Sequence, residues 1–172
     1  MPVDPRSLVR PLLVGLVLLA VASTACACGP VFPLQAGGSP PQSHGGPVRD
    51  HVSFVDALRA AGYTVAIVGK VQQPFLRVPG TVLQLSGPDL RGPAELQSYN
   101  YDDTDLGTDG LAAARADADQ IQPDGQPRGA RVTWTGPPHF FRKERLLVLY
   151  VGDDPAVLAL LTTLLGPQLA GQ

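Results

Sequence analysis

The residues best suited to recognition chemistry lie together in one short stretch: His139, Phe140, Phe141, Arg142 and Lys143. Cations beside aromatic rings suit contact with a partner protein, an anionic lipid head group or a cell-wall anion. We expect residues 136–144 to form a loop that joins two strands. One interpretation is that this loop is a recognition tip. In the simpler alternative, which we favour, this is a hairpin: Phe140 or Phe141 packs on the core, and the two cations face water.

Aspartates dominate the next candidate region: Asp102, Asp103, Asp105, Asp109, Asp117, Asp119 and Asp124. The spacing Asp103-x-Asp105-x-x-x-Asp109 resembles the start of a calcium loop. An EF-hand loop also needs a central glycine and a final glutamate, where this chain has Thr108 and Ala114. We therefore interpret these carboxylates as groups that solubilise a loop and complement the N-terminal dipole of a following helix. We expect neither a metal site nor a cofactor.

No catalytic motif is evident in the sequence. None of the few serines lies in a Gly-x-Ser-x-Gly elbow, and neither His51 nor His139 has a second histidine or cysteine at ligand spacing. We therefore assign no catalytic residue and favour a domain that binds a partner or ligand. The alternative is a cell-envelope enzyme or enzyme accessory whose site combines His139 with carboxylates from residues 102–109. A structural spacer is a third interpretation.

The chain begins with the pattern of an export signal. Arg6 and Arg10 precede an uncharged apolar run over residues 12–22. A membrane-spanning helix needs about 20 apolar residues, so this run fits the core of a signal peptide better than a membrane span. The small residues that follow, Ser23-Thr24-Ala25-Cys26, resemble the bacterial lipobox, with Ser23 where that motif usually has leucine.

The lipobox resemblance implies cleavage before Cys26 and attachment of lipid to its thiol, which anchors the protein to a membrane outside the cytoplasm. An ordinary cleaved secretory signal and an uncleaved anchor are the alternatives. Cys28 lies too close to Cys26 for a disulfide between them to stabilise a fold. The formal net charge of −2 argues against nucleic acid as a partner. The expected partners are the membrane, through the lipid anchor, and an envelope protein or an anionic ligand.

Composition divides the chain into three parts. Residues 1–25 are the predicted signal peptide. Residues 26–48 are rich in glycine, proline and serine, which is typical of a tether. Residues 49–172 carry the periodic apolar segments of a globular domain, long enough for one core of its own.

Within this domain the apolar periodicity predicts eight elements. They are a helix over 52–61 between Asp50 and Gly62, strands over 63–68, 81–86 and 94–101, a helix over 108–121, strands over 131–135 and 145–151, and a helix opened by Asp154 and Pro155. Residues 145–151 are apolar on both faces, which predicts a central strand. Hairpin-like connections predict an α+β fold, a two-layer sandwich whose mostly antiparallel sheet has about five strands, with about three helices on one face.

Several short strings also resemble a group of small bacterial lipoproteins over roughly residues 52–170. They are Tyr99-Asn100-Tyr101-Asp102, Pro123-Asp124-Gly125, Pro137-Pro138-His139-Phe140-Phe141-Arg142-Lys143 and Gly152-Asp153-Asp154-Pro155. This resemblance implies export and lipidation, and it implies no particular chemistry.

Overall fold

The computed structural model describes residues 46–171. The predicted signal peptide (1–25), Cys26 and most of the predicted tether lie outside these described residues. Val48, the last residue of that tether, is buried in the core, so the packed part of the chain begins before the predicted boundary at residue 49. In residues 46–171 no helix is long and apolar enough to cross a bilayer.

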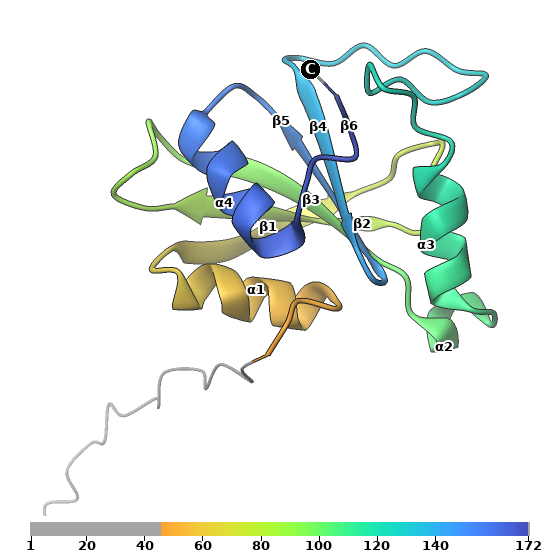
Figure 1. The fold of residues 1–172 in the computed structure, drawn as a ribbon, viewed down its shortest axis with the longest axis horizontal. Coiled ribbons are helices and arrows are strands. Elements are labelled where there is room, and N and C mark those ends of the chain that lie inside the picture. The colour runs from red at the N-terminus through yellow and green to blue at the C-terminus, as the bar shows by residue number, and fades with distance from the viewer. Residues whose placement is uncertain (1–45, 172) are drawn as a thin grey trace, which may run out of the picture. The chain divides into compact units, whose positions relative to one another are not determined.

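The described chain folds into one open sheet with helices around it (Figure 1). The elements, in chain order, are α1 (His51–Ala60), β1 (Thr64–Val71), β2 (Gly80–Ser86), β3 (Ala94–Asn100), α2 (Asp103–Leu106), α3 (Gly110–Ala118), β4 (Pro138–Lys143), β5 (Leu146–Val151), α4 (Pro155–Leu165) and β6 (Ala170–Gly171). The strands lie in the order β1-β2-β3-β5-β4-β6, and every neighbouring pair is antiparallel. The predicted α+β sandwich with an antiparallel sheet is therefore confirmed, as is the inner position of β5.

Both faces of the sheet carry an apolar cluster. On one face, α1 and α4 contribute side chains such as Phe54 and Leu161, which pack with Val148 of β5. On the other face, small residues of α3, such as Ala114, pack with Leu147 of the same strand. Our expectation that all helices lie on one face is thus wrong for α3, because β5 is apolar on both sides and each side needs a cover.

The helices begin where the sequence places their caps. Asp50 Oδ1 accepts a hydrogen bond from the backbone N–H of Ser53 (2.8 Å), which closes a capping box at the start of α1. Gly62 follows this helix with a φ of 92°, a conformation that glycine adopts without a side-chain clash. Asp154 and Pro155 open α4, as predicted.

A bulge in β1 directs side chains of this edge strand into the apolar clusters on both faces of the sheet. The register with β2 shifts between Ile67 and Gly69, so Val68 is an extra residue. Val65, before the bulge, packs against the α1 and α4 cluster, whereas Val71, after it, packs against the α3 cluster. In a regular strand without a bulge, two residues six positions apart would point to the same face.

The prediction of a strand over 131–135 and a loop over 136–144 is wrong. Residues 131–135 are irregular, because the side chain of Gln126 pairs with the backbone of Val132: it accepts from the N–H (2.9 Å) and donates to the carbonyl (3.2 Å). The strand is β4, from Pro138 onward. It is buried on both faces and therefore lacks the alternation by which a half-exposed strand is recognised.

Candidate functional site

The stretch proposed as a recognition tip forms part of the sheet instead. Phe140 and Phe141 are fully buried, on opposite faces, and His139 is 4% exposed. Lys143 donates from Nζ to the carbonyl of Leu164 (2.9 Å) at the end of α4. The hairpin alternative therefore describes both phenylalanines, and three of the five side chains offer no surface to a partner.

His139 is not brought to the acidic region. In β4 it pairs with Tyr150, whereas Asn100, at the end of β3, pairs with Leu146. The two positions on β5 are four residues apart, which corresponds to on the order of 13 Å along a strand. Residues 102–109 begin beyond Asn100, so the alternative enzyme site built from His139 and these carboxylates does not assemble.

Another histidine does meet a serine, but the pair is closed to substrates. His51 Nδ1 lies 2.6 Å from Ser98 Oγ, and Ser98 is 2% exposed. Burial lowers the pKa of His51, partly offset by the negative charge of Asp50. Because a nucleophile must reach its substrate, we interpret the pair as a structural link between α1 and β3.

The aspartates divide into caps and ion-pair partners. Asp102 and Asp109 cap α2 and α3, which agrees with the expected role at helix N-termini. Asp103 forms an ion pair with Arg145 (2.7 Å). In the part of the chain that the structure describes, no group of three or more histidine, cysteine or acidic residues could hold a metal ion.

Asp117 differs from the other aspartates because it is buried at 2% exposure. Its Oδ2 accepts hydrogen bonds from Tyr101 Oη (2.8 Å) and from the backbone N–H of Arg77 (2.8 Å). The Arg77 Nε lies 3.0 Å from Oδ1. This network joins α3 to the segment after β1 and to the end of β3, and both carboxylate oxygens of Asp117 are engaged in it.

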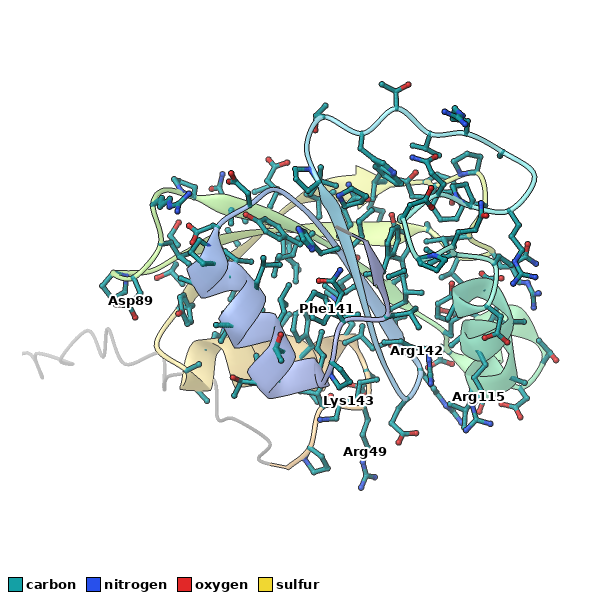
Figure 2. The ribbon with its side chains drawn as sticks, turned by 45° about the horizontal axis from the view of Figure 1, so that its top comes forward. Arg49, Asp89, Arg115, Phe141, Arg142 and Lys143 are labelled. Atoms are coloured by element: carbon teal, nitrogen blue, oxygen red, sulfur yellow. The ribbon has the colours of Figure 1, made fainter. Side chains whose placement is uncertain are left out.

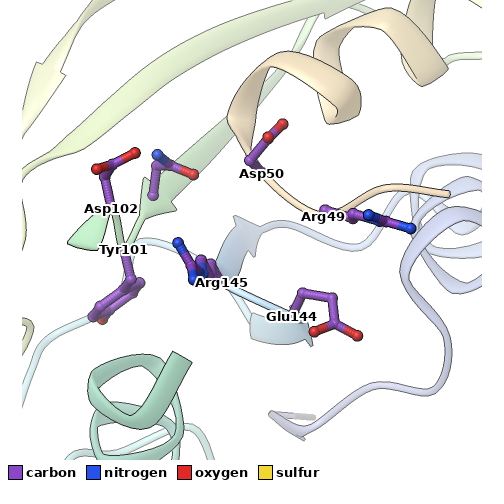
Figure 3. A pocket seen from close by; sticks show the side chains of 7 residues that line it. Arg49, Asp50, Tyr101, Asp102, Glu144 and Arg145 are labelled. Carbon is purple, nitrogen blue, oxygen red and sulfur yellow. The ribbon is translucent and has the colours of Figure 1, made fainter. Parts of the chain in front are cut away.

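Among the described residues, a hollow of about 300 Å³ is lined entirely by polar and charged residues (Figure 3). Its lining consists of Arg49, Asp50, Asn100, Tyr101, Asp102, Glu144 and Arg145. We call it the arginine cleft. Ligand pockets in proteins start at about this size.

Three distant segments meet at the arginine cleft: the start of α1, the end of β3 and the turn between β4 and β5. The backbone N–H of His51 donates to Asn100 Oδ1 (3.1 Å), which joins the first two. The N–H of Tyr101 donates to the carbonyl of Arg145 (2.9 Å), which joins the last two. Glu144 makes the tight turn possible with a φ of 48°, a rare value outside glycine.

The charges in this cleft are fixed but only partly paired. Asp50 and Asp102 each use Oδ1 to cap a helix, and the Ser53 hydroxyl also donates to Asp50 Oδ1 (2.7 Å). Hydrogen bonds from Ser53 lower the pKa of Asp50, and the backbone N–H of Thr104 lowers that of Asp102. Both groups are therefore ionised at neutral pH.

The two arginines of the cleft differ in their pairing. Arg145 is held by Asp103 through Nη2 and is 42% exposed. Arg49 forms no ion pair with any residue of the described range. The cleft thus presents one positioned and one unpaired guanidinium beside two ionised carboxylates.

Two further hollows offer fewer free groups. One, of about 420 Å³, lies between Arg91 and Asp154, whose Oδ2 accepts the backbone N–H of Arg91 at 2.9 Å. The other, of about 380 Å³, lies over the Arg77–Asp117 ion pair. In both, the central carboxylate is already bound to a neighbouring segment, so we regard the arginine cleft as the candidate site.

Sequence reasoning did not find this cleft. It identified Asp50 as a helix cap and Asp102 as one of the carboxylates of residues 102–109, and it assigned no role to Arg49, Asn100 or Arg145. These residues are far apart in the chain and belong to no local motif. Their one shared signal is that each stands within a few residues of a predicted element boundary.

Comparisons with protein-family models, with curated proteins and with solved structures found no match to this chain. Any functional assignment therefore rests on the sequence and on the geometry of the cleft.

Proposed function

We propose that this protein is an exported lipoprotein, anchored to the membrane through Cys26, whose domain binds a small polar ligand in the arginine cleft. The anchor is supported by the apolar run over residues 12–22 and by the lipobox-like residues that follow it. On this proposal the domain works on the outer side of the membrane, within the cell envelope.

The observation that carries the binding role is a hollow lined by charged side chains, one of which, Arg49, forms no ion pair with any described residue. Charged side chains that line a hollow and keep free hydrogen-bonding atoms are available to a ligand. Catalysis has less support. Among the described residues, the only contact of a histidine with a serine is closed by the burial of Ser98.

The position of the cleft is compatible with a membrane anchor. Arg49 and Asp50 line the cleft and lie immediately after residues 46–48, through which the chain enters the domain. The ligand site is therefore at the end of the domain from which the predicted tether departs.

The anchor is tested by growing cells that express the full chain with radiolabelled palmitate. We expect the label in the protein and the protein in the membrane fraction. Cys26→Ala should lose both, whereas the matched control Cys28→Ala should keep both, because Ser23-Thr24-Ala25 before Cys26 matches a lipobox better than Ala25-Cys26-Ala27 before Cys28. Continued labelling and membrane retention of the Cys26→Ala protein would refute the anchor.

A further inference from the structure

We infer that α4 docks on the surface of the membrane, with its outer face against the lipid and with Arg49 and Lys143 beside the head groups. This inference adds a second contact to the proposed function and rests on its anchor, because the lipid on Cys26 is what keeps the domain close to a bilayer.

The outer face of α4 carries no charge. Its exposed residues are small or uncharged: Pro155, Ala159, Thr162 and Thr163. No charged side chain occurs anywhere in residues 155–172. The other two long helices differ, since α1 exposes Arg59 and α3 exposes Arg115. Because a surface helix normally presents charged and polar side chains to water, this face is suited to a partner that is not water.

The polar groups of this face are already satisfied by the helix itself. Thr162 Oγ1 donates to the carbonyl of Leu158 (2.8 Å), and Thr163 Oγ1 donates to the carbonyl of Ala159 (2.9 Å). Leu158 and Leu160 beside them are only partly buried by the core below. A hydroxyl bonded in this way needs no hydrogen bond from water, so contact with lipid leaves no donor without a partner.

The membrane is the partner that the anchor brings within reach. On the proposed function, residues 26–45 join the lipid to the start of the described chain. A flexible segment of this length spans on the order of 25 Å. The bilayer surface is then present at a high effective concentration, so a weak contact is enough to hold the domain on it. Neither a second copy nor another protein is tied to the chain in this way.

Two cations lie near the C-terminal end of α4. Lys143 Nζ donates to the carbonyl of Leu164 there (2.9 Å). Arg49 lines the arginine cleft with Glu144, the neighbour of Lys143, and Figure 2 shows Arg49 and Lys143 on the same side of the molecule. Cations at the rim of a docked helix suit lipid phosphates. Glu144 and Asp50 offset much of this charge, so the uncharged helix face carries the contact.

The test uses the lipidated full chain in phosphatidylcholine vesicles, part of whose lipid carries a nitroxide quencher on the acyl chain. In a Cys28→Ala background the lipid occupies the thiol of Cys26, and Ala159→Cys supplies one free thiol on α4 for a nitrobenzoxadiazole dye. Ala112→Cys is the matched control, because Ala112 is an exposed alanine of α3, which packs on the opposite face of the sheet. We expect the dye on Ala159→Cys to be quenched at least about threefold more strongly than the dye on Ala112→Cys.

A charge placed on the docked face should release it. Thr163→Glu, added to the Ala159→Cys protein, should reduce quenching to the level of the control, because a carboxylate is costly to remove from water. Thr163 is exposed and glutamate is a good helix former, so folding is retained. Ala112→Glu adds the same charge to α3 and should leave the quenching of the dye on α4 unchanged.

Equal quenching on α4 and α3, or full quenching retained in Thr163→Glu, overturns the inference. A dye on α4 that is shielded from water but not quenched, with a signal that depends on the ratio of protein to lipid, identifies a second copy as the partner and also overturns it. The labelling itself tests the anchor. Protein that takes one dye and floats with the vesicles but shows no quenching refutes the docking alone. Protein that also takes dye on Cys26 and does not float refutes the anchor, and the docking with it.

Discussion

At the scale of single residues, the acidic side chains of this domain show how environment divides one residue type into several roles. Asp109 lies at the surface and caps a helix, Asp103 pairs with an exposed arginine, and Asp117 is enclosed by donors. The sequence predicted the first role, because an aspartate before a helix is a local signal. It could not predict the burial of Asp117, whose partners lie 40 and 16 residues away.

Asp117 should be the aspartate most important for stability. In Asp117→Asn, the backbone N–H of Arg77 and the hydroxyl of Tyr101 keep an acceptor, but the guanidinium of Arg77 loses its anionic partner. Since Arg77 is itself 50% exposed, we expect a loss of about 2 kcal/mol in the free energy of unfolding, below the cost for a fully buried pair. Urea denaturation measures this loss. The exposed neighbour Asp119→Asn should stay within about 0.5 kcal/mol of the parent, and an equal loss in both variants would contradict the role of burial.

His51 should make the stability of the domain depend on pH in the weakly acidic range. Burial lowers the pKa of its imidazole below the ordinary value of about 6.5. The unfolded chain therefore binds the proton at a higher pH than the folded chain, and stability falls as the pH drops below about 6.5. The lowered pKa values of Asp50, Asp102 and Asp154 act separately, at more acidic pH, below the ordinary aspartate pKa of about 3.9.

The variant His51→Gln isolates this effect, because glutamine stays neutral and can still hydrogen-bond to Ser98. We expect its free energy of unfolding, measured by urea at several pH values, to change less than that of the parent between pH 7 and pH 5. An equal change in the free energy of unfolding with pH in both proteins would exclude His51 as the source of the pH dependence.

At the scale of elements, local signals predicted the helix ends well and failed for the strand β4. Caps such as Asp50 and Asp154 act within three residues and are visible in sequence. The β4 strand has no such signal: it begins with Pro138, and it is apolar on both faces because Phe141 packs in the cluster under α1 and α4 and Phe140 packs in the cluster under α3. The alternating residues 131–135, which do look like a strand, are held irregular by one glutamine side chain. The turn after β4 contributes Glu144 and Arg145 to the arginine cleft. Because the strand before this turn was predicted in the wrong place, this part of the site was not predicted either.

At the scale of the whole molecule, the two edges of the sheet differ in how far their backbone groups are paired. The β4 edge is partly paired by β6, through Phe140 and Ala170. The β1 edge has no neighbour among the described residues, and two of its apolar side chains are exposed, Ile67 at 67% and Val68 at 49%. The bulge at Val68 disturbs the edge where these side chains lie, and such irregularity discourages pairing with another chain.

The remaining exposure of β1 should make it the site where the domain first aggregates. A lysine on an edge strand opposes strand addition through its charge and its hydration. Ile67→Lys should therefore delay aggregation on mild heating, followed by light scattering, with a free energy of unfolding within about 0.5 kcal/mol of the parent because this side chain packs little. Thr64→Lys is the matched control, since it adds the same charge to an exposed position of the same strand but leaves the apolar surface in place. An equal delay in both variants would attribute the effect to net charge and not to the apolar edge. A delay confined to Ile67→Lys would show that the bulge protects this edge only in part, and that the exposed apolar side chain of Ile67 promotes aggregation.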